Sequence, residues 1–202
     1  TLHESRTAGV LVVGDGTGAV NSATLAVGAN TLTVSGATTI DSDGRVNGVG
    51  TLNTDGILTN SGTLSTTSVV ASKDVTLTGG IANLTLDGTT AQTVTVPTGG
   101  TTFSEELVVN NTAGVTFAGM NSGSAVLVGG QTIVGSAVTV VNEGLTLTEG
   151  VLTIPDGNSL ILTHGGSGIQ GYTRTNGCVF GTVRKQLSNT TSTAPADRLD
   201  FP

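Results

Sequence analysis

The stretch that decides the fold is Thr51-Leu52-Asn53-Thr54-Asp55-Gly56-Ile57-Leu58-Thr59-Asn60-Ser61-Gly62. It contains two short runs in which apolar and polar residues alternate, and each run ends in Asp-Gly or Ser-Gly. Alternation with a period of two indicates a half-buried β-strand, and Gly supplies the backbone freedom that a tight turn needs. Similar units recur at residues 31–36, 75–79, 92–97, 144–150 and 159–163. The sequence therefore predicts an all-β chain of many short strands.

The spacing of the turns separates one all-β architecture from another. Hairpin sandwiches place turn signals about every 8–12 residues and have large aromatic core residues. Here turns recur about every six to eight residues, and the inward residues are Leu, Val, Ile and Ala, as in a chain that coils and stacks each coil on the last. Three strand-and-turn units make a coil of about 18–24 residues. We therefore expect a parallel β-solenoid (β-helix) of roughly nine to eleven short coils.

The composition excludes several other classes. The 202 residues include 38 Thr and 31 Gly, while charged residues make up 10% and aromatic residues 2%. Helical bundles need Ala, Leu, Glu and Lys, and collagen needs Gly at every third position. Disordered chains are less apolar than this one, whose mean hydropathy is +0.23, and no apolar run approaches the length of a membrane-spanning helix. The net charge of −7 argues against binding to a phosphate backbone, which needs a basic stripe.

The composition changes near residue 170. Four of the seven basic residues follow that point, together with the single Tyr and the single Cys: Arg174, Arg184, Lys185, Arg198, Tyr172 and Cys178. A stacked solenoid needs an atypical unit to cover its open end. We therefore expect a β-solenoid repeat region over residues 1–170. Residues 171–202 are expected to form a distinct C-terminal cap or the start of a following domain.

A resemblance to a known family comes from the repeats and from this last segment. Thr-Leu-Thr-x-x-Gly repeats are followed by Gly171-Tyr172-Thr173-Arg174, by Gly181-Thr182-Val183-Arg184-Lys185 and by Phe201-Pro202. This order resembles large surface proteins of Bacteroidetes-type bacteria, in which parallel β-helical repeats precede a G-x-V-x-R segment and then F-P-V-G. Many of those proteins carry a type IX secretion signal further on. The resemblance implies an extracellular or cell-surface location and an adhesive or structural role, and it brings no catalytic residues.

One pair of carboxylates is a candidate metal site. Asp41 and Asp43 lie in Asp41-Ser42-Asp43-Gly44, and Asp-x-Asp before a Gly turn presents oxygen ligands as a calcium loop does. The later ligands of such a loop, including a bidentate Glu at its twelfth position, are missing. The pair is therefore interpreted either as an ordinary turn or as a weak calcium site, and no other cofactor is expected.

The remaining reactive residues do not predict an active site. His3 and His164 are far apart in the sequence, and Glu105 and Glu106 are adjacent, so on a strand they face opposite sides. Lys73 and Asp74 alone do not supply the cluster that a polysaccharide lyase needs. The segment from Gly14 to Gly18 lacks the Lys-Ser or Lys-Thr of a phosphate loop. We therefore expect a protein that is not an enzyme.

The leading hypothesis is a non-enzymatic extracellular structural protein, which serves as a solenoid stalk, an adhesin segment or a filament subunit. Its expected partners are other copies that stack end to end, and surface glycans or other cell-surface proteins, with no nucleic acid and no membrane insertion. One alternative is a carbohydrate-binding or polysaccharide-cleaving β-helix. A second alternative is an ice-binding solenoid, since ranked Thr hydroxyls and methyls can match an ice lattice. The Thr-x-Thr pairs begin at Thr31, Thr76, Thr93 and Thr146, and these spacings are too irregular to guarantee that the pairs share one face.

Overall fold

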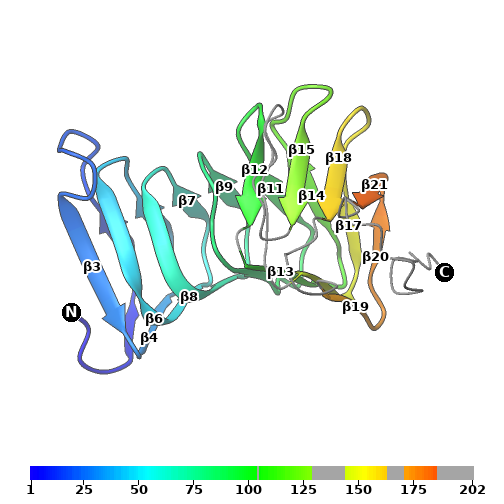
Figure 1. Ribbon diagram of the computed structural model, residues 1–202. Coiled ribbons are helices and arrows are strands. Elements are labelled where there is room, and N and C mark those ends of the chain that lie inside the picture. Colours follow the sequence, from blue (N-terminus) through cyan, green and yellow to red (C-terminus); the bar gives the residue numbers. More distant parts are fainter. Residues whose placement is uncertain (104, 129–143, 163–170, 186–202) are drawn as a thin grey trace, which may run out of the picture.

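The computed structural model describes residues 1–103, 105–128, 144–162 and 171–185. Over these ranges the chain forms 21 β-strands and no helix. Every strand pairing among them is parallel, and the strands stack in chain order along one axis (Figure 1). The predicted parallel β-solenoid is confirmed.

Sheet A runs the length of the stack. Its strands, in order, are β1 (Arg6–Ala8), β4 (Thr31–Val34), β6 (Gly44–Thr54), β8 (Thr63–Ala71), β10 (Leu84–Leu86), β13 (Glu106–Asn110), β16 (Gly144–Glu149) and β19 (Gly171–Arg174). The long strand β6 bends around a corner of the coil, because its first half pairs with β3 (Ala23–Gly28) and its second half pairs with β4. The bend falls at Gly48, whose φ of 127° is one that Gly tolerates and other residues avoid.

Sheets B and C form the other sides of the coil. Sheet B contains β2 (Leu11–Val13), β5 (Thr38–Ile40), β7 (Leu58–Asn60), β9 (Val75–Leu77), β11 (Gln92–Thr95), β14 (Val115–Ala118), β17 (Val151–Thr153) and β20 (Cys178–Phe180). Sheet C contains β12 (Gly100–Phe103), β15 (Ala125–Val128), β18 (Ser159–Leu162) and β21 (Thr182–Lys185). Each coil contributes one strand to sheet B, so the described residues form eight coils.

The coils differ widely in length. In the register of sheet B, Leu58 follows Thr38 by 20 residues and Val75 follows Leu58 by 17, whereas Leu152 follows Val115 by 37. The described strands keep their register in spite of these differences in length. The estimate of nine to eleven coils assumed coils of average length, and the described residues form eight.

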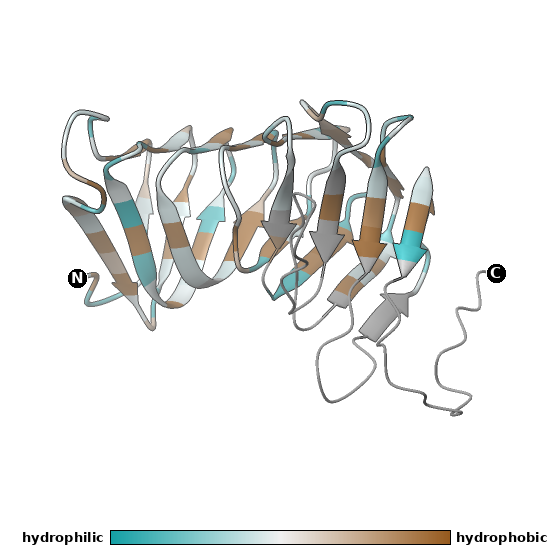
Figure 2. Ribbon diagram, turned by 45° about the horizontal axis from the view of Figure 1, so that its top comes forward, coloured by the Kyte–Doolittle hydropathy of each residue, from teal (hydrophilic) through white to brown (hydrophobic). Residues whose placement is uncertain are grey.

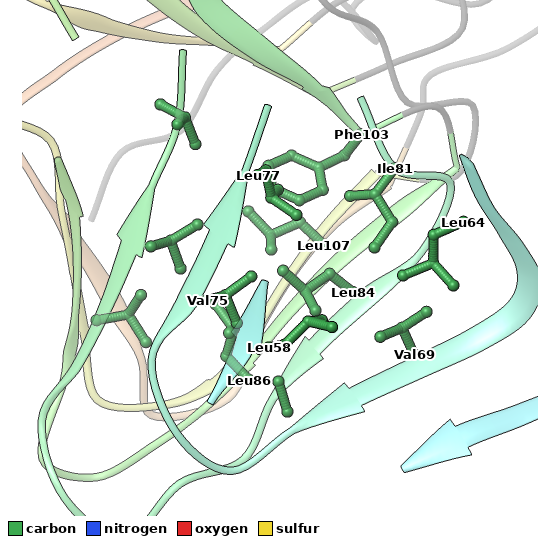
Figure 3. Packing of buried hydrophobic residues seen from close by; sticks show 14 of the residues in the cluster. Leu58, Leu64, Val69, Val75, Leu77, Ile81, Leu84, Leu86, Phe103 and Leu107 are labelled. Carbon is green, nitrogen blue, oxygen red and sulfur yellow. The ribbon is translucent and has the colours of Figure 1, made fainter. Parts of the chain in front are cut away.

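The core is one apolar column inside the stack. Inward residues of successive coils lie in register, as Leu84, Leu107 and Leu145 do, and each of the three is at most 1% exposed. Figure 2 shows hydrophobic and hydrophilic residues alternating along the strands, and Figure 3 shows the aliphatic side chains that meet inside. Burial of one such side chain contributes about 1.5–3 kcal/mol.

Two aromatic rings also enter this column. Phe103 and Phe117 are fully buried, and their rings meet edge to face with centroids 6.0 Å apart. Here two rings from adjacent coils share the interior in a favourable aromatic geometry.

The described part of the C-terminal region continues the stack. Strands β19, β20 and β21 pair in register with β16, β17 and β18, and so add one more coil. Residues 186–202 lie outside the described residues, and the boundary expected at residue 170 stays a prediction. Within the described ranges there is no helix with the length and apolarity needed to cross a bilayer.

Candidate functional site

Asp43 is the one carboxylate of the candidate calcium pair that is buried, with 4% of the residue exposed. Its Oδ1 accepts hydrogen bonds from the backbone N–H groups of Asp15, at 3.0 Å, and Gly16, at 2.8 Å. Its Oδ2 accepts a hydrogen bond from the Ser22 hydroxyl at 3.2 Å. Residues 14–22, which we call the Asp43 loop, belong to the first coil, whereas Asp43 belongs to the second. The carboxylate thus ties a long turn to the coil that follows it.

The Asp43 loop closes around the carboxylate only because two positions lack a side chain. A Cβ on Gly14 would lie 2.3 Å from Asp43 Oδ1, and a Cβ on Gly18 would lie 2.8 Å from Asp43 Oδ2. Gly14 also has a φ of 90°, which favours Gly. The stretch from Gly14 to Gly18 thus surrounds an anion, as a phosphate loop does, although its sequence does not match one. The anion is the carboxylate of Asp43, a side chain of the same protein.

Hydrogen bonds lower the pKa of Asp43 below its ordinary value of 3.8. The main cause is the backbone N–H of Gly16, which stabilises the charged form, and the hydroxyl of Ser22 acts in the same direction. Burial raises the pKa and opposes part of this effect. Asp43 is therefore ionised at neutral pH, and the charge is held by donors of the same chain.

Asp41 lies half-buried at the same corner, and its backbone C=O accepts a hydrogen bond from the N–H of Gly44 at 2.8 Å. Among the described residues, no group of three or more His, Cys, Asp or Glu side chains converges as a metal site would need. The turn and the anchored loop account for the Asp-x-Asp-Gly sequence in structural terms, and the calcium interpretation stays a prediction.

The other described reactive residues occupy different parts of the chain, apart from the adjacent Glu105 and Glu106. His3 is exposed ahead of β1, Cys178 is an exposed free thiol on β20, and His164 lies outside the described residues. Glu105 accepts a hydrogen bond from the Asn83 side chain, while Glu106 Oε1 accepts one from the Thr146 hydroxyl at 2.8 Å. These contacts link neighbouring coils on the outside of sheet A.

A buried polar network at the start of β11 was not anticipated. The Gln92 side chain is 2% exposed and donates to the backbone C=O groups of Ala71 and Lys73, at 2.9 and 2.8 Å. Its Oε1 accepts hydrogen bonds from the N–H of Gly88 and from the Asn111 amide, at 3.0 and 2.8 Å. All four hydrogen-bonding positions of the amide are thus satisfied, which removes the penalty of burying it. In the sequence, the one sign of this network was Gln92 itself, a polar residue at an inward position of an alternating strand.

The outer surface of sheet B carries the feature with the most regular geometry. Strand register places Thr39, Thr59, Thr76 and Thr95 opposite one another in four successive coils. A second column, two residues along the strand, contains Thr93, Thr116 and Thr153 in three successive coils. We call these seven residues the threonine face.

The threonine face only partly contains the Thr-x-Thr pairs seen in the sequence. Thr93 and Thr95 both lie on β11 in sheet B, and Thr76 lies on β9, but Thr78 follows that strand and donates to the C=O of Asn60 at 3.3 Å. The pairs that begin at Thr31 and Thr146 lie on strands of sheet A. Columns between coils, rather than pairs within a strand, organise the threonines.

Comparison of the chain with protein-family models, with curated proteins and with solved structures finds no match.

Proposed function

We propose that the chain is a non-enzymatic structural segment of an extracellular protein, as a β-solenoid stalk or adhesin segment, or as a filament subunit that assembles by end-to-end strand stacking. The observation that supports this proposal is the unbroken parallel stack of eight coils around one apolar column. The extracellular placement is supported by the resemblance of the sequence to bacterial surface proteins.

The hydrogen bonds of this stack run along its axis. In sheet B, successive coils are joined by hydrogen bonds such as those from Thr38 N–H to Ile57 C=O, at 2.9 Å, and from Gln92 N–H to Gly114 C=O, at 3.1 Å. The other sides of the coil add parallel ladders of their own. Tension along the axis therefore loads several ladders at each step. At about 4.8 Å per step, the seven steps between the eight coils span about 34 Å. Such a body suits a rigid spacer.

The first coil offers an edge on which another coil can stack. The N–H of Leu11 and the C=O of Val13 both bond to the neighbouring coil, so the N–H and C=O of Val12 point to the opposite edge of β2. Within the described residues, β2 pairs only with β5. By contrast, the edge of β3 is partly covered, because the N–H of Leu2 donates to the C=O of Ala26 at 2.7 Å. Free strand edges are templates for pairing with another chain.

The test compares Val12→Pro with Val12→Thr in sedimentation velocity and negative-stain electron microscopy. Proline removes the edge N–H without removing a bond to β5, whereas Thr keeps it. We expect rods for all three proteins, longer rods at higher concentration for the wild type and Val12→Thr, and single rods for Val12→Pro. Circular dichroism confirms that each variant is folded. Wild-type particles that stay single at every concentration reject the filament role, and compact round particles reject the stalk.

A further inference from the structure

The threonine face is rich in Thr, a composition that suits binding to an uncharged, ordered partner. The outward side chains of all eight strands of sheet B are uncharged. In six successive coils, from β5 to β17, at least one of them is a Thr. Outward valines and an alanine flank these threonines: Val12, Ala118 and Val151. The strands of this surface therefore present mainly methyl groups and hydroxyls, with Cys178 and Phe180 in the last described coil. One carboxylate borders them, because Asp74 Oδ1 accepts a hydrogen bond from the N–H of Thr93 at 2.8 Å.

The threonine hydroxyls are available to a partner. Among the described residues, none of the seven side-chain hydroxyls has a hydrogen-bond partner within the protein, and Thr116 is exposed while the other six are half-buried in the sheet. Thr is β-branched, so its χ1 angle is restricted before any partner binds. A side chain that is already ordered loses little entropy on binding, which favours association.

The spacing of the hydroxyls is set by the stack. Residues opposite one another in a parallel sheet lie about 4.8 Å apart along the axis, and the step repeats from Thr39 to Thr95 without a change of register. The second column, which begins at Thr93, starts in the coil where the first one ends. This repeat is close to the repeat of water oxygens in hexagonal ice, and a flat array of hydroxyls and methyls at that spacing can order water in the same lattice.

We propose that the outer surface of sheet B binds ice, through the threonine face. A crystalline polysaccharide is the competing partner, because it is also flat, uncharged and periodic. It is less favoured, because sugar rings bind best to exposed aromatic side chains. Among the side chains that the structure describes, the one exposed aromatic is Phe180, in the last coil. The proposal concerns a surface that end-to-end stacking does not use, so the two proposals fail independently.

The test measures thermal hysteresis and ice recrystallisation for the wild type, Thr76→Lys and Thr85→Lys. Thr76 lies in the middle of the longer column, between Thr59 and Thr95. Thr85 lies on the outside of sheet A, between Val70 and Val108, and is half-buried like Thr76, so it is a matched control. We expect hysteresis for the wild type and for Thr85→Lys, and a fall to the buffer value for Thr76→Lys. Circular dichroism and the unfolding midpoint show that both variants are folded.

Three results would overturn the proposal. The first is a wild type that shows no hysteresis and does not inhibit recrystallisation at any concentration. The second is an equal loss in Thr76→Lys and Thr85→Lys, which would mean that the threonine face is not the binding surface. The third is binding to cellulose or chitin in a pull-down that Thr76→Lys abolishes, without hysteresis in the wild type, which would assign the face to a polysaccharide.

Discussion

Val69 and Val70 are adjacent on β8 and allow the inward and outward sides of the solenoid to be compared with one substitution. Val69 is 1% exposed and pairs with Leu52 in the core, whereas Val70 is half-buried on the outside, between Asn53 and Thr85. Val69→Ala removes two buried carbons, worth about 1.6 kcal/mol at about 0.8 kcal/mol per carbon. A cavity that does not collapse adds about 1 kcal/mol. We therefore expect Val69→Ala to lower the free energy of unfolding by about 2–3 kcal/mol.

The outward variant isolates the contribution of burial. Val70→Ala removes the same atoms from a half-buried position, so we expect a loss of less than about 1 kcal/mol. Both variants lose the same β-propensity, which cancels in their difference. Urea unfolding followed by circular dichroism measures the loss in the free energy of unfolding for each variant. If the coils unfold separately, native-state hydrogen exchange of the coils around β8 measures the same loss locally. Equal losses, or a larger loss for Val70→Ala, would refute the assigned faces, since a slip of one residue exchanges inward and outward side chains.

Two further predictions concern the turns. Gly150 and Gly123 have φ angles of 83° and 90°, but a Cβ on Gly150 would lie 1.7 Å from the C=O oxygen of Asn111, while a Cβ on Gly123 would meet no atom within 4 Å. We therefore expect Gly123→Ala to lower the free energy of unfolding by about 1–2 kcal/mol, from backbone strain alone, and Gly150→Ala to lower it clearly more. Thermal unfolding measures both variants, and similar unfolding midpoints would contradict the close approach at Gly150. The lowered pKa of Asp43 means that its charged form stabilises the folded state above pH 3.8, and that this contribution is lost as the pH falls below that value. The urea midpoint of the wild type should exceed that of Asp43→Asn at pH 7, and the gap should narrow below pH 4; a gap independent of pH would show that the charge does not matter.

Alternation made the strands and their inward residues predictable. In Thr51-Leu52-Asn53-Thr54 the pattern assigns Leu52 to the core, and the structure buries it completely. Aliphatic inward residues and frequent turns indicated a coil rather than a sandwich, because short strands gain stability only when they stack. The tie between Asp43 and the Asp43 loop could not be predicted in this way. It joins residues 27 and 28 positions apart, across coils whose lengths follow no fixed period.

By itself, the sequence determined which residues face inward and where the chain turns, since these properties depend on neighbours a few positions away, and the frequency of the turns indicated a stacked coil. Only the tertiary structure decided which threonines line up, because Thr39, Thr59, Thr76 and Thr95 are 20, 17 and 19 residues apart and share a column solely through the hydrogen-bonded register of sheet B. The same holds for the partners of Gln92 and Asp43. Turns of unequal length separate positions in the chain without moving them in the stack, so spacing along the sequence does not reveal proximity in space.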